Sequence, residues 1–525
     1  MKGTQFVRFL YLRSRKLLNM DFITSLVRLY LGGRLRAMKR YDTEFEHLQR
    51  QTLRHLISMA KRTEWGRQYD FAKINDYSQF AAKVPLGSYA SHKPYIERMM
   101  QGEKDVLWRG RVKHFATSSG TTSDKIKFIP VSRQGLHKCH LQGGHDVTAS
   151  YLDRHPASRL SKGYSLVLSG NFNPKYTTAK AKVGDVSAIM ASAIPQVFRR
   201  LMHIVPPLEV SQIQDINQKY DAIADIIGKK NLVTFSGTPD WLLVLLRRTM
   251  EKQGAQSLHE LWPNMEFFGH GGMSFMPYKP IYDQLFAPNK ICYIENYNAS
   301  EGFFGIQNDA EDHSMLLMLD YEVFYEFIPM SEYGKPDATA LPLWETETDR
   351  DYALLVTTSS GLWRYDIGDV IRFTRKAPYK FVIIGRTHQS INVWGEDLSV
   401  QQAEKALADA CEATGAKVLE FTAAPLIYPD SADGRHQWLI EFDKRPESLE
   451  QFAAELEKCV RAADHDYEHF SVDAGGILHP LEVIEAGKGL FYRWMEAHGK
   501  FGGQHKVPRL SGRRTQFEEL LAMNG

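Results

Sequence analysis

Three short stretches, far apart in the chain, carry side chains suited to holding a nucleotide. They are 117–128 (TSSGTTSDKIKF), 297–301 (YNASE) and 363–369 (WRYDIGD). The first combines small hydroxyl residues and a glycine with two lysines, so its backbone N–H groups and hydroxyls can surround a polyphosphate. The second offers an aromatic face, a hydroxyl and a carboxylate. The third places a carboxylate after a glycine, where it can accept hydrogen bonds from a ribose diol. Together these residue types predict an ATP site.

Each stretch alone also has a plainer interpretation. A Ser/Thr/Gly run is typical of a flexible surface turn. The pentapeptide 297–301 is compatible with a strand end and a solvated carboxylate, and Asp369 with a cap on the turn after Gly368. The Walker pattern GxxxxGK[ST] does not occur in the sequence, so the predicted site is not a P-loop. What favours the nucleotide is the combination of the three stretches.

The order of these motifs resembles the adenylate-forming superfamily, which includes acyl-CoA synthetases and luciferase-like enzymes. The chain is most similar to the auxin-responsive family of acyl acid–amido synthetases and its bacterial relatives. Beside the three stretches, the resemblance rests on Gly385-Arg386 before a small C-terminal part and on 129–132 (IPVS), 236–241 (SGTPDW), 271–278 (GGMSFMPY) and 504–509 (QHKVPR). It extends from about residue 45 to about residue 515.

This resemblance implies a role for each matching residue. The phosphate loop corresponds to Ser118, Ser119, Gly120, Thr121, Thr122 and Lys127. The resemblance places Tyr297 along the adenine, Ser300 near the α-phosphate, Glu301 at Mg²⁺, and Asp369 with Arg386 at the ribose. Lys506 matches the C-terminal lysine that reaches into the site. The residues expected to take part in catalysis are Lys506, Glu301 and Lys127.

Two positions depart from the family pattern. Asp124 stands where the family often has glycine, and an acid near phosphate is unfavourable unless it points away or pairs with Lys125. His388 stands where the wider superfamily often has aspartate, which bears on how the C-terminal domain rotates.

The implied function is that of an ATP- and Mg²⁺-dependent acyl acid–amido synthetase. Such an enzyme converts a small carboxylic acid to acyl-AMP and transfers the acyl group to an amino acid or another amine. Two alternatives remain open at this point. One is an acyl-CoA synthetase that uses the same first step, and the other is a nucleotide-binding protein without catalysis.

Size and element pattern predict an α/β protein of two domains. A chain of 525 residues is too long for one ordinary core. The boundary is expected between 1–384 and 385–525, with a hinge near 385–389. The larger domain is expected to hold β-sheets flanked by helices and a β-barrel-like part, and the smaller to be a mobile α+β domain. Helices are predicted at 42–62, 239–254, 399–411 and 447–463; strands at 163–170, 231–236, 265–269, 290–296, 316–319, 323–328, 354–358, 370–374, 381–384, 417–422 and 437–442.

Charge is concentrated at the beginning of the chain. Residues 1–40 contain ten Lys/Arg against one acid, Asp21, although the net charge of the whole chain is only +3. Apolar residues alternate with these cations, which favours a helix that packs on the body with its arginines in water; a weak membrane contact is the alternative. No apolar run is long enough for a transmembrane helix. Four scattered cysteines suit the cytoplasm. We expect a monomer with no nucleic-acid partner.

One cluster has the residue types of a metal site. His137, Cys139, His140 and His145 follow the first stretch closely. Positions 137 and 140 share a helix face, so zinc is conceivable. No second pair lies at finger-like spacing, and Gly143-Gly144 is expected to break the helix before His145. The sequence therefore favours a solvated helix over a metal site.

Overall fold

The structure, a computed structural model, consists of two compact units. It describes residues 22–118, 126–272, 275, 279–288, 290–309, 311–335, 337–387, 390–396, 398–429, 431–498, 509–512 and 514–524. Contacts group Met1–Ser118 with Phe128–Ile384, here called the N-terminal unit. Gly385–Gly525 forms the C-terminal unit.

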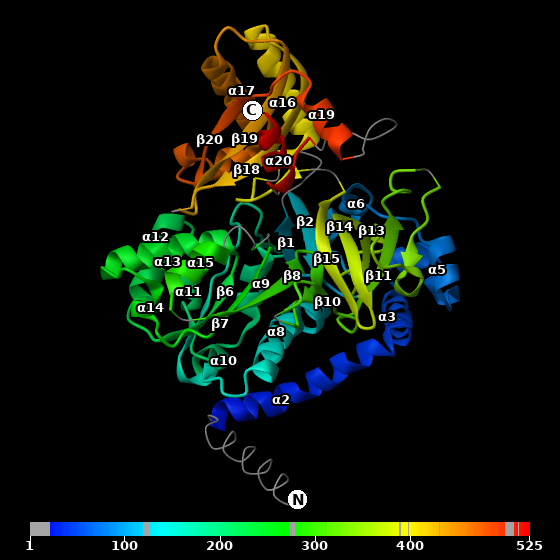
Figure 1. Ribbon diagram of the computed structural model, residues 1–525. Coiled ribbons are helices and arrows are strands. Elements are labelled where there is room, and N and C mark those ends of the chain that lie inside the picture. The colour runs from blue at the N-terminus through cyan, green and yellow to red at the C-terminus, as the bar shows by residue number, and fades with distance from the viewer. Residues whose placement is uncertain are drawn as a thin grey trace, which may run out of the picture. The chain divides into compact units, whose positions relative to one another are not determined.

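A mixed sheet of twelve strands forms the centre of the N-terminal unit in the described residues (Figure 1). Five neighbouring strands are parallel: β5 (Ile204–Val205), β3 (Tyr164–Val167), β6 (Leu232–Gly237), β7 (Phe267–Gly271) and β8 (Cys292–Ala299). The sheet continues through β9 (Gly302–Ile306), β10 (Met315–Leu317), β15 (Tyr379–Arg386), β14 (Tyr365–Lys376), β13 (Asp351–Thr358), β11 (Val323–Pro329) and β12 (Leu341–Pro342). Strands predicted from the sequence are found in both parts, so the α/β expectation is confirmed.

Alternation of side chains along β7 shows how helices cover both faces of the parallel strands. The ring of Phe267 stacks on Tyr151 of α8 (Leu141–Arg154), with centroids 4.7 Å apart. The next residue, Phe268, points to the opposite face and lies 5.1 Å from Tyr282 of α15 (Lys279–Phe286). Successive side chains of a strand point to opposite faces of the sheet, so β7 is covered by helices on both faces. In Figure 1 the green helices α12 (Ile216–Ile227), α13 (Pro239–Gln253) and α15 group together beside these strands.

Two predicted helices of this unit are confirmed. Helix α3 (Phe45–Ala60) lies within the predicted 42–62 and buries Leu48, Leu53 and Leu56. Helix α13 begins with Pro239 in its first turn and ends at Gly254, whose φ of +66° is left-handed. Proline suits the first turn because its missing N–H has no helical partner there, and glycine adopts the left-handed cap at no steric cost.

A basic side chain of helix α2 (Phe22–Lys39) makes a different contact from the one expected from the sequence. Arg34 does not point to water: its guanidinium donates to the buried carboxylate of Asp146 on α8 and to Asp320. Leu31 and Met38 are buried with the core. The helix therefore packs on the body, as expected, but through an ion pair that sequence periodicity does not reveal. In the described residues, no helix is both long and apolar enough to span a bilayer.

The C-terminal unit is a small α/β structure with its own core. Its sheet has the order β18 (Lys417–Ile427), β19 (Gly434–Lys444), β20 (Leu478–Glu485). Phe442 packs on Phe452 of α17 (Leu449–Ala463), which contacts α16 (Val400–Thr414). Leu439 belongs to a second cluster with α19 (Leu490–Ala497) and α20 (Thr515–Met523). The predicted pair of strands and pair of helices are present; β20, α19 and α20 were not predicted.

Candidate active site

The residues of the second stretch form the tip of a β-hairpin. Strands β8 and β9 are antiparallel, and Ala299 pairs with Gly302. Ser300 and Glu301 are therefore the two-residue turn between them. Because β8 is also the last of the parallel strands, this turn lies at their carboxyl edge, where ligands of open α/β sheets bind. Glu301 is half-buried there.

Ser300 connects this turn to the beginning of the first stretch. Its hydroxyl donates a hydrogen bond to the carbonyl oxygen of Thr117, at 3.0 Å. Thr117 belongs to β1 (His114–Ser118), which ends at the half-buried Ser118, and Lys127 begins β2 (Lys127–Val131). Ser119, Gly120, Thr121 and Thr122 of the predicted phosphate loop lie between these strands and outside the described residues. The hairpin tip and the start of that loop are thus fixed to each other.

Tyr297 connects the same hairpin to the third stretch. The sequence predicts a strand ending at 296, with Tyr297 beyond it, but β8 continues to Ala299 and Tyr297 lies inside it. Its ring packs edge-on against Phe304, with centroids 5.1 Å apart, and its hydroxyl donates to the carboxylate of Asp369 on β14. Three strands separate β8 from β14 in the sheet order, so the sheet must curve back on itself here.

A bulge in β14 aims Asp369 at this position. Asp366 pairs with Leu355 and Val370 pairs with Ala353, so residues 367–369 lie opposite one residue of β13. Gly368 has φ +84°, a conformation that L side chains rarely adopt, and its N–H donates to Asp366 at 2.8 Å. Bulges of this kind re-aim a side chain next to a site. The glycine before Asp369 therefore has a definite structural reason.

The first half of the same stretch is structural. The indole N–H of Trp363 donates to the carbonyl of Leu107 at 3.0 Å. Arg364 is buried, pairs with Glu326 at 2.8 Å and donates to the carbonyl of Val84. Burial raises the pKa of the Glu326 carboxyl, while the Arg364 charge acts in the opposite direction. Only the end of the 363–369 stretch therefore faces the candidate site.

A second acid and an amine, neither predicted from the sequence, lie beside β1. Asp185 accepts a hydrogen bond from the N–H of Asn171 at 2.8 Å, and its other oxygen lies 3.5 Å from the hydroxyl of Thr117. The Nζ of Lys219, on α12, donates to the carbonyl of Ser169 at 2.6 Å and to Asn171 at 2.9 Å. Burial raises the pKa of Asp185 and lowers that of Lys219 to about 8. These groups hold the loop after β3 against the end of β1.

The one sequence signal for this cluster is Ser169-Gly170-Asn171 after a predicted strand. A Cβ at Gly170 would lie 1.9 Å from a carboxylate oxygen of Asp185, so only glycine allows the close approach. Asp185 and Lys219 themselves carry no motif, because their partners are distant in the sequence.

Profiles of a protein family match most of this chain. The GH3 family N-terminal domain matches residues 34–225, the central domain matches 316–386 and the C-terminal domain matches 401–515. The chain belongs to the GH3 family. The central-domain match contains the bulge with Asp369, and the three matches follow in chain order.

Curated GH3 relatives are similar over nearly their whole length. The indole-3-acetic acid-amido synthetase GH3.8 of Oryza sativa subsp. indica is 23% identical, over 91% of this chain and 90% of the relative. The 4-substituted benzoates-glutamate ligase GH3.12 of Arabidopsis thaliana is also 23% identical, over 93% and 97%. The solved AtGH3.15 acyl acid amido synthetase, in complex with 2,4-DB, matches with TM-score 0.59, 18% identity and coverage of 93% and 95%. This chain therefore has the GH3 fold.

Several predicted residues of this GH3 chain lie outside what the structure describes. Lys506, in the stretch 499–508, and His388, in the predicted hinge, are two of these residues. Arg386 is the last residue of β15, and nothing is described of its side chain. The described half of the candidate site is therefore its N-terminal part: the β8–β9 hairpin, the end of β1 and the β14 bulge.

The metal-like cluster of the sequence is a packing feature in this GH3 structure. The predicted break at Gly143-Gly144 is wrong: α8 runs through both glycines. A Cβ at Gly143 would meet the ring of Phe303 at 2.3 Å, so glycine lets the helix approach β9. Cys139 contacts the backbone of Phe303, and His140 is buried with its Nδ1 2.8 Å from the Asn298 amide oxygen. The helix is therefore not fully solvated, and within the described residues no metal-binding group forms.

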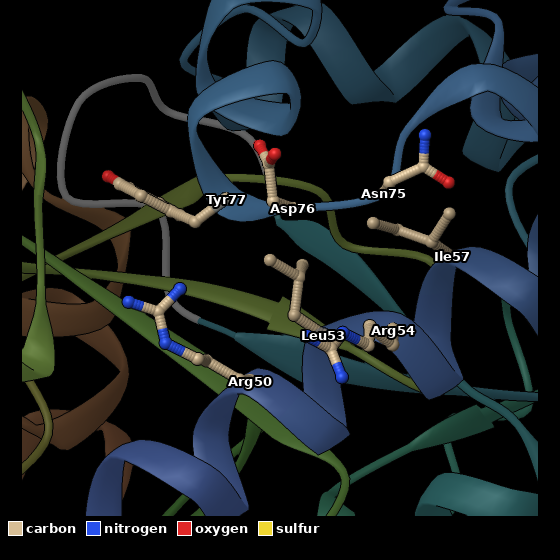
Figure 2. A pocket seen from close by; sticks show the side chains of 7 residues that line it. All are labelled: Arg50, Leu53, Arg54, Ile57, Asn75, Asp76 and Tyr77. Carbon is tan, nitrogen blue, oxygen red and sulfur yellow. The ribbon is translucent and has the colours of Figure 1, made fainter.

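A shallow pocket lies elsewhere in the N-terminal unit (Figure 2). Its volume of about 260 Å³ includes open solvent, and it lies between α3 and the start of α5 (Tyr77–Lys83). Its polar groups have structural partners: Asp76 caps α5, Tyr77 donates to the Ala340 carbonyl, and Arg50 stacks 4.1 Å from the Trp344 ring centroid. It shares no residue with the hairpin site.

Proposed function

We propose that this GH3 protein activates a carboxylic acid with ATP and joins it to an amine, with an amino acid as the expected acceptor. The observation that carries the proposal is the β8–β9 hairpin. Ser300 donates a hydrogen bond to the end of β1, and Tyr297 donates one to Asp369. Glu301 lies at the turn between β8 and β9. The family match and the activities for which the relatives are named support the same chemistry.

In the first step, the acid's carboxylate attacks the α-phosphorus of ATP. A P–O bond forms, the bond to the bridging oxygen of the β-phosphate breaks, and pyrophosphate leaves with its electrons. We assign the ribose diol to Asp369, the adenine to the edge of Tyr297, and the phosphates to Ser118–Thr122 and Lys127. Such chemistry asks mainly for positioning and charge stabilisation, so a Ser-His-Asp triad is not required.

Glu301 fits the needs of Mg²⁺. Mg²⁺ prefers oxygen ligands and commonly binds through one or two carboxylates together with phosphate oxygens, and Glu301 is a half-buried carboxylate at the strand edge. When bound, the ion would neutralise phosphate charge. The chain's own contribution is to hold this carboxylate at a rigid two-residue turn.

In the second step, the nitrogen of the amine attacks the carbonyl carbon of the acyl-AMP. The C–N bond forms, the C–O bond to AMP breaks, and the nitrogen loses a proton to give the amide. We assign Lys506 to the first step and a rotation about the 385–389 hinge to the interval between the steps. Exclusion of water during that interval would protect the mixed anhydride from hydrolysis.

Mass spectrometry of reaction mixtures tests this proposal. The purified protein, ATP and Mg²⁺ are incubated with a panel of acids that begins with indole-3-acetate and 4-substituted benzoates, the substrates named for the relatives. We expect acid-dependent acyl-AMP, and an amide when amino acids are added. Thioester formation with coenzyme A but no amide would identify an acyl-CoA synthetase instead. Tight ATP binding without AMP formation across a broad panel would indicate a non-catalytic binder.

A further inference from the structure

The surface of α10 (Gln196–Leu201) exposes a cluster of apolar side chains. Val197 is 76% exposed, Phe198 57% and Leu201 58%. Seven large hydrophobic residues are exposed in the part of the chain that the structure describes, and three of them lie within the five positions 197–201. Single exposed apolar residues are ordinary, whereas clusters mark interaction surfaces. This cluster therefore needs an explanation.

The polarity of α10 is inverted relative to an ordinary surface helix. Arg199 is its buried residue, 5% exposed, and its guanidinium donates to the carbonyls of Ala191 at 3.2 Å and Pro206 at 2.7 Å. Burial lowers the pKa of this guanidinium, which reflects the cost of removing its charge from water. In α10 the arginine is buried and anchors the helix, while Val197, Phe198 and Leu201 point outward. The helix therefore forgoes the stabilisation that burial of these apolar side chains would give. Such an arrangement is expected where the outward face has its own partner.

Cations surround the apolar cluster. Arg200 of α10 is exposed, and so is His203, which follows the helix. The His203 ring packs on Tyr164, with centroids 5.2 Å apart, and the Nζ of Lys230 lies 4.6 Å from the centroid of the same Tyr164 ring. Arg200 and His203 thus adjoin the exposed apolar residues along the chain, and Lys230 reaches the Tyr164 ring on which His203 packs.

The sequence around this surface is strongly basic. Residues 154–208 contain eight Lys/Arg and one acid, Asp185, whose carboxylate bonds the backbone of Asn171. Glu209 is the next acid along the chain. A second basic region, residues 1–40, has ten Lys/Arg and one acid and includes α2.

Helix α2, the described part of the second region, lies at the same end of the N-terminal unit as α10. Helix α2 contacts the short helix η4 (Leu160–Lys162), which directly precedes β3. Strand β3 pairs with β5 at the edge of the sheet, and α10 contacts β5. Figure 1 shows α10 and the start of α2 together at the lower end of the unit. Helix α2 and the exposed apolar residues of α10 therefore lie at the same end of the unit.

We propose that α10 and the cations around it form a docking surface for an anionic lipid bilayer. A bilayer surface offers both components that this surface matches: an interfacial region that accepts Val197, Phe198 and Leu201, and phosphate groups that attract the surrounding cations. A nucleic acid would match the cations but has no comparable use for three aliphatic and aromatic side chains. A symmetric dimer through this face would bring the same cations of two copies together.

Vesicle co-sedimentation with the full-length protein tests the proposal. Vesicles of phosphatidylcholine alone are compared with vesicles that also contain phosphatidylglycerol, at low and high salt. We expect binding to the anionic vesicles, weakened by salt because part of the attraction is electrostatic. Absence of binding to phosphatidylglycerol vesicles at low salt would overturn the proposal.

Variants distinguish binding through the apolar cluster from binding through charge alone. A triple variant, Val197→Ser, Phe198→Ser and Leu201→Ser, should weaken binding by at least about tenfold, since each side chain contributes by burial of apolar area. Arg200→Glu should weaken it several-fold and only on anionic vesicles. Leu419→Ser, at a 55% exposed leucine of the C-terminal unit, is the matched control and should bind like the parent.

Two outcomes would contradict the assignment to α10. If the triple variant binds anionic vesicles as tightly as the parent, the basic residues alone are responsible. If the parent is a dimer by light scattering and the triple variant a monomer, the face is an interface between copies. Because the three side chains are exposed, the variant should melt at the parent's temperature, which serves as the folding control.

Discussion

Carboxylates in this molecule fall into two groups that differ in exposure. Glu301 and Asp369, at the hairpin and the β14 bulge, are half-buried at the edge of the large sheet. Glu396, in the C-terminal unit, is fully buried and accepts hydrogen bonds from the N–H groups of Val393 and Trp394 and from His436. Hydrogen bonding alone does not separate the two groups, since Asp369 also accepts from Tyr297. The half-buried acids lie at the candidate site, whereas the fully buried acid holds the chain together.

The strongest test of this division is Glu301→Gln. We expect acyl-AMP formation to fall by about 10²–10³-fold, because the variant removes a charge that is assigned to metal binding in the transition state. The melting temperature should stay within a few degrees of the parent. Pre-steady-state formation of acyl-AMP measures the first quantity and calorimetry the second. A stable variant with unchanged adenylation would place Glu301 outside the chemistry.

Glu396→Ala should have the opposite profile. It leaves two N–H groups and His436 without their buried acceptor, so we expect the C-terminal unit to lose about 3 kcal/mol of unfolding free energy. Urea unfolding with hydrogen exchange over residues 393–442 measures this loss. Glu447→Ala, at an exposed acid of the same unit, is the control and should change little. Equal stability of the two variants would remove the distinction between buried and exposed acids.

Asp369→Asn should act on ATP binding. Asparagine keeps the size of the side chain, but hydrogen bonds to a charged group contribute about 1.5–3 kcal/mol, so the KM for ATP should rise about 10- to 100-fold. Asp351→Asn, which removes only a surface partner of Arg372, is the matched control. Steady-state kinetics at varied ATP measure the effect. An increase in the KM for the acid alone would contradict the ribose assignment.

Arg34→Met tests the structural role of a charge that was expected, from the sequence, to face water. The variant leaves the buried Asp146 with Tyr321 and Gln142 as donors but without a cation, and should cost about 2 kcal/mol of unfolding free energy. Arg40→Met, at an exposed pair with Glu44, should change the free energy of unfolding little. Chemical denaturation compares the two.

The smallest expected effect is on acid stability. Burial lowers the pKa of His140 from 6.5 to about 4, so the unfolded chain takes up the proton first as pH falls. The stability that neutral His140 contributes is complete above pH 6.5 and is lost as pH falls toward 4. Between pH 6.5 and about pH 5.5 the parent should lose about 1 kcal/mol more than His140→Gln. His137→Gln, at an exposed residue of the same turn, should track the parent; parallel curves for all three proteins would contradict the burial argument.

Local periodicity predicted the α/β class and most strands of the large sheet, and short motifs indicated the residues that we propose for the hairpin site. The sequence did not predict what depends on distant partners. Asp185 and Lys219 meet only when β1, the loop after β3 and α12 pack together. Gly143 lies inside α8 because the Phe303 ring occupies the space that a Cβ would need there.

The same limit applies to the third stretch. Arg364 and Asp369 are five residues apart and equally polar, yet one is buried against Glu326 and the other faces the candidate site. The bulge at Gly368 makes the difference, and a bulge depends on the pairing of two strands. Sequence spacing cannot show which residues of a motif serve the fold.

The central claim is that the β8–β9 hairpin and Asp369 bind one ATP molecule that activates an acid. The most direct measurement is equilibrium binding of a non-hydrolysable ATP analogue, by calorimetry, to the parent and to the Asp369→Asn and Glu301→Gln variants. We expect one site per chain, weaker binding in the Asp369 variant, and loss of the Mg²⁺ dependence in the Glu301 variant. Full-strength, Mg²⁺-dependent binding by both variants would place the nucleotide elsewhere and contradict the account.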